Sequence, residues 1–340
     1  MATIVKSSPA AEASDEMIVR GEPIPPQSVE HGYDQNWYPI ALSSDVEAGG
    51  IYGTEFMNGR VIVVRGEDGT PQVLSAYCRH LGADLKDGAM VEGKVRCPFH
   101  HWDYNAEGQC VATAVGDKAP TRAKLFRFPT EESIGFIWAF NGLEPLYDLP
   151  HFPVPVDELE LKVEFEQLVT VDHFVPFSNS SDIQHLRSVH QIDLTVNPED
   201  VEVTPHGMRY AQTMNIPGMG PLEQHVTIFG TNCLIFETSF MGRLVYQMSA
   251  GKALPGNRTL ASMMVATPKS TGEPGEDEMI DNVLDQAMLF GRTLFEEDDI
   301  VMRSISFRQD ILTPADRQLS NFLAYVRKYP RTSIACDMIA

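Results

Sequence analysis

Two short loops carry cysteine and histidine in the same order. The first contains Cys78 and His80, and the second, after sixteen intervening residues, contains Cys97 and His100. Two thiolates and two imidazoles can hold a tetrahedral zinc ion, or a [2Fe–2S] cluster in which two imidazoles replace two thiolates on one iron. Zinc fingers usually pair cysteine with cysteine and histidine with histidine, whereas each loop here has one of each. The spacing therefore favours the [2Fe–2S] cluster, with zinc as the alternative.

A second group of candidate ligands lies about a hundred residues downstream. Asn179, Asp182, His185 and His190 follow one another at spacings of three, three and five. Two imidazoles and a carboxylate on one face of an Fe(II) ion leave positions open for O₂. On an ideal helix the two histidines would point about 140° apart, so both can bind one ion only if a π-type turn or a break lies between them. By itself this pattern is equally typical of a solvated helix surface.

The residues around the first two loops make that motif longer and more specific. From Cys78 the chain reads Cys-Arg-His-Leu-Gly-Ala-Asp-Leu, and from Cys97 it reads Cys-Pro-Phe-His-His-Trp; the pattern continues through Tyr104 and Gly108 to Cys110. This segment resembles the Rieske domain of the Rieske non-haem iron oxygenases. The resemblance implies that the paired loops bind a Rieske [2Fe–2S] cluster through Cys78, His80, Cys97 and His100.

The resemblance also gives the second group a role. The catalytic domain of this family carries Asn-x-x-Asp-x-x-His followed by a second histidine, which implies that His185 and His190 bind a mononuclear Fe(II). The third ligand should then be a downstream carboxylate, and the acidic run that ends at Asp298 and Asp299 resembles the segment that supplies it. Asp298 falls on the apolar side of a predicted helix, where an unpaired carboxylate is costly unless it binds metal. We therefore expect Asp298 to be the ligand, with Asp299 as the alternative.

Asp182 and Asn179 are expected to serve the catalytic site without binding iron. In the family, the residue equivalent to Asp182 links a histidine of the mononuclear iron to a cluster histidine of the neighbouring subunit. A carboxylate can accept from imidazole N–H groups on both sides and orient both rings. The resemblance thus implies a head-to-tail homotrimer. The alternative for Asp182 is an ordinary aspartate on a helix surface.

Composition and patterning indicate a two-domain protein. The chain has 340 residues, 43% of them hydrophobic, and a net charge of −21, which argues against nucleic acid as a partner. Its longest apolar runs are too short for a membrane span, the first 26 residues lack the apolar core of a signal peptide, and five cysteines form no evident disulfide framework. A reducing compartment such as the cytoplasm is the natural interpretation.

The predicted elements divide at a proline-rich segment, residues 145–155. Residues 1–34 are expected to be a loose tail, 35–150 an all-β Rieske domain and 151–340 a catalytic domain. In the last of these, strand-like runs precede an amphipathic helix from Ile280 to Ile305, and a helix is expected over Ser178–Gln191. The fold class is therefore α+β, and the resemblance implies a helix-grip catalytic domain with an antiparallel sheet and long helices.

The resemblance implies a terminal oxygenase component. Electrons from NAD(P)H would arrive through a separate ferredoxin and/or flavin reductase, since the chain has no dinucleotide-binding fingerprint of its own, and the mononuclear Fe(II) would activate O₂. The sequence of the two loops is most similar to the 3-ketosteroid 9α-hydroxylase oxygenase type. This resemblance favours monooxygenation of a bulky apolar substrate that is steroid- or terpenoid-like. Aromatic ring dihydroxylation and oxidative O- or N-demethylation remain alternatives, as does an electron carrier without oxygenase activity.

Two further sets of residues are candidates for binding surfaces. The segment around the cluster loops has a small excess of positive charge, which predicts a docking face for an acidic redox partner, with ordinary surface charge as the alternative. Its basic residues are Arg79, Lys86, Lys94 and Arg96, and its acidic residues are Asp84, Asp87 and Glu92. Aromatic and methionine side chains of the second domain could line a substrate pocket or simply form its core; they are Phe174, Phe177, Phe229, Phe236, Met248 and Met263.

Overall fold

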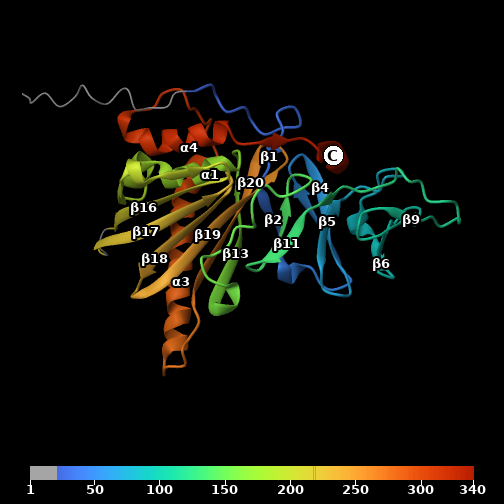
Figure 1. The fold of residues 1–340 in the computed structure, drawn as a ribbon, viewed down its shortest axis with the longest axis horizontal. Helices are drawn as coiled ribbons and strands as arrows, with labels where there is room; N and C mark the ends of the chain where they lie inside the picture. The colour runs from blue at the N-terminus through green and yellow to red at the C-terminus, as the bar shows by residue number, and fades with distance from the viewer. Residues whose placement is uncertain (1–20, 217, 219) are drawn as a thin grey trace, which may run out of the picture.

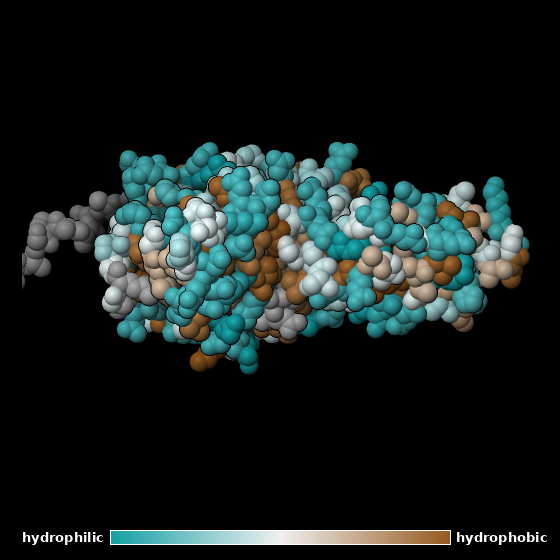
Figure 2. Space-filling model, turned by 90° about the horizontal axis from the view of Figure 1, so that it is seen from below, coloured by the Kyte–Doolittle hydropathy of each residue, from teal (hydrophilic) through white to brown (hydrophobic). Residues whose placement is uncertain are grey.

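A computed structural model describes residues 21–216, 218 and 220–340 of the chain. The first 20 residues of the expected N-terminal tail therefore lie outside the described residues. Within the described part, no helix is both long and apolar enough to cross a membrane. The face of the molecule seen in Figure 2 is mainly hydrophilic, with apolar residues gathered along its middle.

The N-terminal part consists of short antiparallel strands. They are β2 (Trp37–Leu42), β3 (Ile51–Phe56), β4 (Gly59–Arg65), β5 (Pro71–Ser75), β6 (Ala89–Val91), β7 (Lys94–Arg96), β8 (Asp103–Tyr104), β9 (Cys110–Ala112), β10 (Arg127–Phe128), β11 (Thr130–Ser133) and β12 (Phe136–Phe140). Three sheets result, with the orders β10-β5-β4-β3, β11-β12-β2 and β6-β7-β8-β9. The last of these forms one end of the molecule (Figure 1).

Strand β4 connects the paired Cys/His loops to the body of this region. Alternate side chains of a strand point to opposite faces, so its continuous apolar run serves two cores. Val61 and Val63 pack into a core with Phe56 and Phe128. Ile62 and Val64 pack into a second core that contains both loop cysteines and Tyr104. One buried strand thus ties the cluster loops to the body of the domain.

The second part of the chain forms one large antiparallel sheet. Its strands are β13 (Leu159–Val169), β14 (Asp193–Val196), β15 (Glu202–Thr204), β16 (Gly207–Ile216), β17 (Gly220–Phe229), β18 (Cys233–Phe240), β19 (Arg243–Leu254) and β20 (Arg258–Pro268). The order is β13-β20-β19-β18-β17-β16-β14, with β15 paired to β16. Consecutive strands from β16 to β20 are neighbours, which is the meander that the sequence predicts.

Helices cover one face of this sheet and its end. They are α1 (Phe174–Ser178), α2 (Ile183–Ser188), α3 (Glu276–Met302), α4 (Arg317–Arg327) and α5 (Cys336–Ile339). The long helix α3 runs across the sheet, and α4 lies beside α1 (Figure 1). An all-β domain followed by an antiparallel sheet with helices is the α+β class expected from the sequence, and the structure confirms it.

The large sheet is buried on both faces in its β19–β20 region. Val245 and Val265 pack against α3, whereas their neighbours Tyr246 and Met264 pack against Trp138 of the first domain. Lys252 of β19 is also buried, and its Nζ donates to the backbone oxygen of Ile40 at 3.0 Å and to Thr54 Oγ1 at 2.9 Å. Because this contact contains apolar packing and a satisfied buried charge, it fixes the two domains relative to each other.

The C-terminal residues return to the first domain. Strand β21 (Arg331–Thr332) pairs with β1 (Tyr33–Asp34), and Ile339 of α5 packs into the same core as Val61. Gly59 makes this possible, because a Cβ at that position would collide with the carbonyl of Ile339. The end of the expected catalytic domain therefore packs on the Rieske side, and the division at residue 150 stays a prediction.

The predicted elements differ from the observed ones mainly at their ends. The expected helix over 178–191 is broken into α1, a 3₁₀ turn at Asn179–Ser181 and α2. The expected strand from Ile134 begins only at Phe136, because Ile134 and Gly135 both have positive φ values, 56° and 75°. Helix α3 begins earlier than expected, at Glu276 after Gly275 with φ 81°, and it ends at Met302 rather than Ile305.

A buried polar network joins both ends of the described chain to the large sheet. Asp34 is 0% exposed; it contacts Arg331 Nε at 2.8 Å, Thr231 Oγ1 at 2.6 Å and His173 Nε2 at 3.2 Å. Burial by itself raises the pKa of this carboxyl. The opposing effects are larger and lower the pKa below 3.8; they are the hydrogen bond and charge of His173, the charge of Arg331 and the hydrogen bond from Thr231. Asp34 is thus ionised and held by partners from three other segments of the chain.

Replacement of Asp34 tests this network. Asp34→Asn should lower the free energy of unfolding by about 3 kcal/mol near neutral pH, since Arg331 loses its buried partner. A carboxyl with a lowered folded-state pKa stabilises the protein above its unfolded pKa of about 4, and that stability is lost as the pH falls through the folded value. The mutant should therefore lose less stability than the wild type between about pH 4 and pH 2 in urea titrations. Equal pH dependence would contradict the assignment; the exposed Asp310→Asn is the control.

Candidate metal centres

Three side chains from separate segments bring their ligand atoms together. His185 Nε2 and His190 Nε2 are 3.0 Å apart, and Asp298 Oδ1 lies 3.1 Å from the first and 3.2 Å from the second. An ion with bonds of about 2.1 Å at right angles separates neighbouring ligand atoms by about 3.0 Å. Among the described residues, this is the one group of three His, Cys, Asp or Glu side chains whose ligand atoms all lie within 4.8 Å of one another. We name it the His–His–Asp triad.

The local fold between the two histidines makes this convergence possible. Asp182 caps α2 by accepting from the backbone N–H of His185 at 2.9 Å. The helix ends at Ser188, so His190 lies beyond it. Gln191 has φ 58° and turns the chain, and the N–H of Ile192 bonds back to the oxygen of Leu186 at 2.9 Å. The five-residue spacing is thus accommodated by a helix end, the second of the two options that the sequence left open.

The carboxylate of Asp298 has one bonded and one unbonded oxygen. Asn179 Nδ2 donates to Oδ2 at 2.9 Å, whereas Oδ1 is buried without a hydrogen-bond partner within the described residues and faces the two imidazoles. An orphaned buried carboxylate oxygen beside two imidazole nitrogens is costly in the protein alone, and a divalent cation removes that cost. The donor set therefore fits a mononuclear Fe(II).

The alternative ligand, Asp299, points elsewhere. Its carboxylate pairs with Arg303 one helical turn later, with a shortest distance of 2.6 Å, and it lines a different cavity from the triad. The reason is helical geometry, since neighbouring residues on a helix lie about 100° apart around its axis. The structure thus brings Asp298, and not Asp299, to the two histidines.

Glu297 is a contact that the sequence did not reveal. Its Oε2 lies 2.7 Å from His190 Nδ1, whose side chain is only 2% exposed. With Nδ1 protonated and donating to this carboxylate, Nε2 keeps a lone pair directed at the triad, which is the usual support for a metal-binding histidine. Adjacent acidic residues on a helix give no sign of which one reaches back to a histidine 107 positions away. Only the packing of α3 shows it.

Asp182 and Asn179 both lie beside the triad but make separate contacts. Asn179 orients Asp298, whereas the contact recorded for Asp182 is the helix cap on His185. The half-buried position of Asp182 next to a proposed iron ligand agrees with a role in that site. Its link to a cluster histidine of a neighbouring subunit stays a prediction, because the structure contains one chain.

The paired Cys/His loops lie at the tip formed by β6–β9. Both cysteines are buried, at 3% and 1% exposure for Cys78 and Cys97, whereas His80 is exposed and its ring lies 4.7 Å from that of His100. The loops are held by similar backbone bonds, from Gly82 N to the oxygen of Cys78 at 2.9 Å and from His101 N to the oxygen of Cys97 at 3.2 Å. The result is a buried thiol pair below an outward imidazole pair.

Neighbouring aromatic residues support these ligand pairs. Trp102 stacks on the ring of His80 with 4.4 Å between centroids. The Tyr104 hydroxyl lies 3.2 Å from Cys78 Sγ and accepts from the N–H of Arg79 at 3.0 Å. Burial raises the pKa of the Cys78 thiol, so a thiolate here requires a cation, which an iron cluster supplies.

The arrangement also distinguishes the two metals that the spacing allowed. A tetrahedral zinc site needs all four ligand atoms around one ion. In the described part of the chain, no three of the four loop ligands meet within 4.8 Å; the cysteines and the histidines instead form two separate pairs. Two pairs suit the two irons of a Rieske cluster, with thiolates on one and imidazoles on the other.

The cavity beside the triad is small and mostly apolar. Its volume is about 100 Å³, and it is bounded by α1, α2, α3 and the facing strands β18 and β19. Of the six predicted pocket residues, Phe177 and Phe236 line this cavity. Met263 lines a neighbouring cavity, and Phe174, Phe229 and Met248 pack in hydrophobic clusters.

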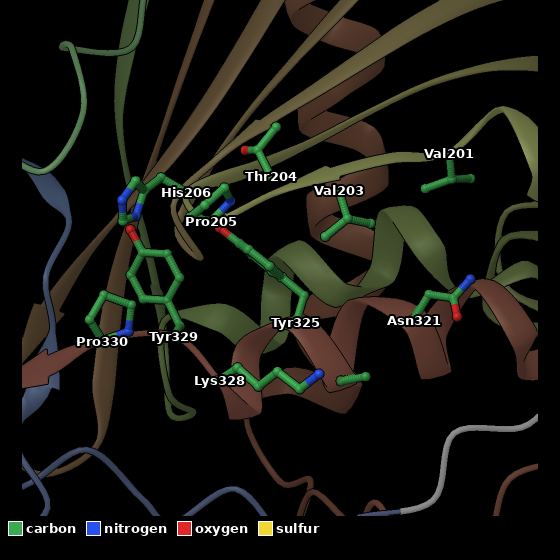
Figure 3. Close-up of a pocket in the computed structure, with 11 residues that line it drawn as sticks. Val201, Val203, Thr204, Pro205, His206, Asn321, Tyr325, Lys328, Tyr329 and Pro330 are labelled. Atoms are coloured by element: carbon green, nitrogen blue, oxygen red, sulfur yellow. The ribbon is translucent and has the colours of Figure 1, made fainter.

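A larger cavity of about 500 Å³ has no part in the triad. It lies between the β15–β16 turn and α4, where Figure 3 shows His206 close to Tyr329 and Lys328 at the outer side. The ring of His206 lies 6.2 Å from that of Tyr329. No Cys, Asp or Glu lines this cavity, so its size alone does not make it the reaction site.

Comparisons with known proteins identify a Rieske domain in the first part of the chain. Residues 36–126 match the profile of the Rieske [2Fe–2S] domain. The chain is 33% identical over 189 residues to cholesterol 7-desaturase nvd of Bombyx mori, covering 54% of this chain and 40% of that protein. It is 30% identical over 128 residues to the oxygenase component of 3-ketosteroid-9-alpha-monooxygenase of Rhodococcus rhodochrous, covering 38% and 33%. The chain thus spans less than half the length of these curated relatives.

Solved structures extend the likeness to the whole fold. Dicamba monooxygenase bound to dicamba superposes with a TM-score of 0.68 at 19% identity, over 87% of this chain and 97% of that one. NdmA of Pseudomonas putida CBB5 with caffeine gives a TM-score of 0.68 at 18% identity, over 86% and 90%. At this identity the likeness concerns the fold, and it includes both domains.

Replacement of Glu297 tests its support of His190. Glu297→Gln should weaken metal binding at the triad about tenfold, because the ring of His190 loses its ionic acceptor. Co(II) titration of the full-length protein, followed by visible absorption, measures this affinity without turnover. Glu296→Gln, on the same helix but exposed and outside the triad, is the matched control and should match the wild type. Identical Co(II) affinity in both variants would show that the contact does not support the site.

Two features of the chain now point to one family. The N-terminal domain matches the Rieske [2Fe–2S] profile and presents two thiols and two imidazoles at its tip. The remainder has the fold of solved Rieske oxygenases and places a His–His–Asp triad beneath an apolar cavity. On these grounds, this chain contains a Rieske [2Fe–2S] domain and shares the overall fold of solved Rieske oxygenases.

Proposed function

We propose that this protein is a terminal oxygenase component that inserts oxygen into an apolar organic substrate. The observation that carries this proposal is the convergence of His185, His190 and Asp298 in a chain that also has a Rieske domain. A Rieske electron carrier needs only the first domain, and the triad argues against that alternative. Relatives named as oxygenases or monooxygenases support the same reaction class.

The residues of the catalytic site would bind, orient and exclude water. A bound Fe(II) would supply O₂ activation with electrons from the cluster. The triad would bind the metal from one side, next to the cavity. Asn179 holds Asp298 in place, and Glu297 holds His190. Leu234, Phe236 and Leu294 give the cavity apolar walls, which exclude water and favour an apolar substrate.

The proposed electron path runs between subunits. The cluster-binding tip and the helices around the triad lie toward opposite ends of the molecule (Figure 1), so a head-to-tail homotrimer would bring one chain's cluster near the next chain's iron. Leu81 and Phe99 flank the cluster histidines and are 68% and 61% exposed, which suits a buried contact in such an assembly. Asp182 is the proposed link across that contact.

A separate ferredoxin and/or flavin reductase is the proposed source of electrons from NAD(P)H. The expected cationic docking face is weaker in the structure than in the sequence, because most of its charges are paired within the chain. Arg96 binds Asp103 at 2.8 Å, and Lys94 lies 3.4 Å from Glu92. Arg79 is exposed beside the cluster and is the cation best placed to meet a partner. All five cysteines are buried and unpaired, in keeping with a reducing compartment.

For the substrate, we propose monooxygenation of a bulky apolar molecule, steroid- or terpenoid-like. Two relatives carry steroid-related names, cholesterol 7-desaturase and 3-ketosteroid-9-alpha-monooxygenase, and the cavity walls are apolar. At about 100 Å³, however, the cavity is below the usual range of about 300–1,000 Å³ for ligand pockets. A bulky substrate therefore requires additional space next to this cavity. Ring dihydroxylation and oxidative demethylation use the same kind of iron site.

Loss of one triad ligand tests the proposed function. The wild type should bind about three irons per chain, two of them in the cluster, and form product only with reductant and O₂. Screening steroid, terpenoid and aromatic compounds for coupled O₂ uptake identifies the substrate. His185→Ala should reduce the iron to about two per chain and abolish product, while the visible spectrum of the cluster stays intact. Loss of that spectrum would show that His185 serves the cluster instead.

Asp182→Asn tests the proposed link between subunits. Both metals should be retained, because Asn can still cap α2, and turnover should fall at least about a hundredfold since the ionic acceptor for imidazole is lost. Product formation and the rate of single-turnover cluster oxidation are measured together. Unimpaired turnover would rule out the bridging role and leave Asp182 as a helix cap only.

A further inference from the structure

Two cavities lie next to each other along helix α3. The inner one, of about 100 Å³, contains the triad. The outer one, of about 280 Å³, lies between α3 and strands β13 and β20. Phe295 lines both, and each cavity alone is smaller than the usual ligand pocket of about 300–1,000 Å³. Joined, they reach that range.

The separating wall is formed by Phe295 and Met263. Phe295 packs against the hydrophobic cluster that contains Met263. Met263 lines the outer cavity, and its Sδ accepts from Gln247 Nε2 at 3.3 Å; Gln247 lines the inner one. Met263 also occupies the space that a side chain at Gly291 would need. Gly291 therefore gives Met263 its place between the two cavities.

The wall has a fixed backbone and adaptable side chains. Gln167 Nε2 donates to the backbone oxygen of Phe295 at 2.9 Å, within the regular helix α3. The side chains of Phe295 and Met263 are held by apolar packing and one weak contact to sulfur. Methionine has three rotatable bonds and refills irregular space easily, so rotation of these side chains opens the wall without movement of the helix.

The two cavities differ in chemistry. The inner walls are mostly apolar. The outer cavity contains charged groups that are already paired, Arg292 with Glu164 at 2.6 Å and Arg303 with Asp299 at 2.6 Å. A charged ligand group would have to break these pairs, whereas a neutral hydroxyl or carbonyl can hydrogen-bond to them as they stand. The outer end therefore suits a neutral polar group.

We propose that Phe295 and Met263 are a movable wall, and that the joined cavities form one elongated substrate site. The ligand is a mostly apolar molecule longer than a single ring. Its oxidised end lies at the triad, and a neutral hydroxyl or carbonyl at its other end lies near Arg292 and Arg303. This inference rests on the proposed function and explains how a small cavity at the iron serves a bulky substrate.

Binding of a short and a long probe tests the movable wall. Isothermal titration calorimetry on the full-length protein with its metals, without O₂ or reductant, measures toluene and testosterone. Testosterone should bind the wild type at least about tenfold more tightly than toluene, because it buries more apolar area. Glu296→Trp places a large ring in the outer cavity and should weaken testosterone at least about tenfold, while toluene changes less than about twofold.

Thr293→Trp is the matched control, since Thr293 is exposed on the same helix and lines neither cavity. It should bind both probes like the wild type. Phe295→Ala removes one of the two wall side chains and should keep or raise the affinity for testosterone. Circular dichroism and iron content confirm that each variant is folded and loaded.

Three results would overturn the proposal. The first is that the wild type binds testosterone no more tightly than toluene. The second is that Glu296→Trp weakens the binding of both probes equally. The third is a Glu296→Trp variant that binds both probes like the wild type. Because no turnover is measured, absence of oxygenase activity leaves this binding test unaffected. The two failures are therefore distinguishable.

Discussion

The uncompensated carboxylate of Asp298 is the constraint on which the functional part of this structure depends. One of its oxygens is buried without a donor and faces two imidazole nitrogens at 3.1 and 3.2 Å. Such an arrangement costs free energy unless a cation is bound. The fold maintains it by holding each group from outside: Asn179 holds the carboxylate, Glu297 holds His190, and the cap by Asp182 fixes the start of α2. Binding of a cation at this site would therefore be coupled to local folding.

The two domains are held together by packing that does not depend on either metal. Strands β19 and β20 present alternate residues to α3 and to the first domain, so one sheet supports the triad on one side and the Rieske domain on the other. The same contact between the domains includes the buried network around Asp34. It also includes the C-terminal elements β21 and α5, which pack on the first domain. A rigid junction of this kind fixes the direction in which the cluster loops point. That direction is away from the triad of the same chain, in keeping with the proposed transfer of electrons between subunits.

Sequence reasoning succeeded where the signal is local. The cluster loops combine four candidate ligands of two types, cysteine and histidine, with turn residues within 23 positions, and the strands around them show regular apolar patterns. The order of strands β16–β20 and the existence of α3 also follow from periodicity. It was less accurate at element ends, as with the broken helix near His185 and the late start of β12, because capping contacts and positive φ values are decided by neighbours in space.

The sequence by itself indicated a Rieske domain, the candidate ligand residues and the α+β class, because those depend on residue types at short spacings and on periodic apolar patterns. Tertiary structure alone decided that Asp298 rather than Asp299 reaches the histidines, that Glu297 supports His190, and that Phe295 separates two cavities. These outcomes depend on the rotation of α3 about its axis and its position on the sheet. A turn of about 100° per residue is enough to exchange one acidic neighbour for another, and that angle is set by packing against β13, β19 and β20, far away in the sequence.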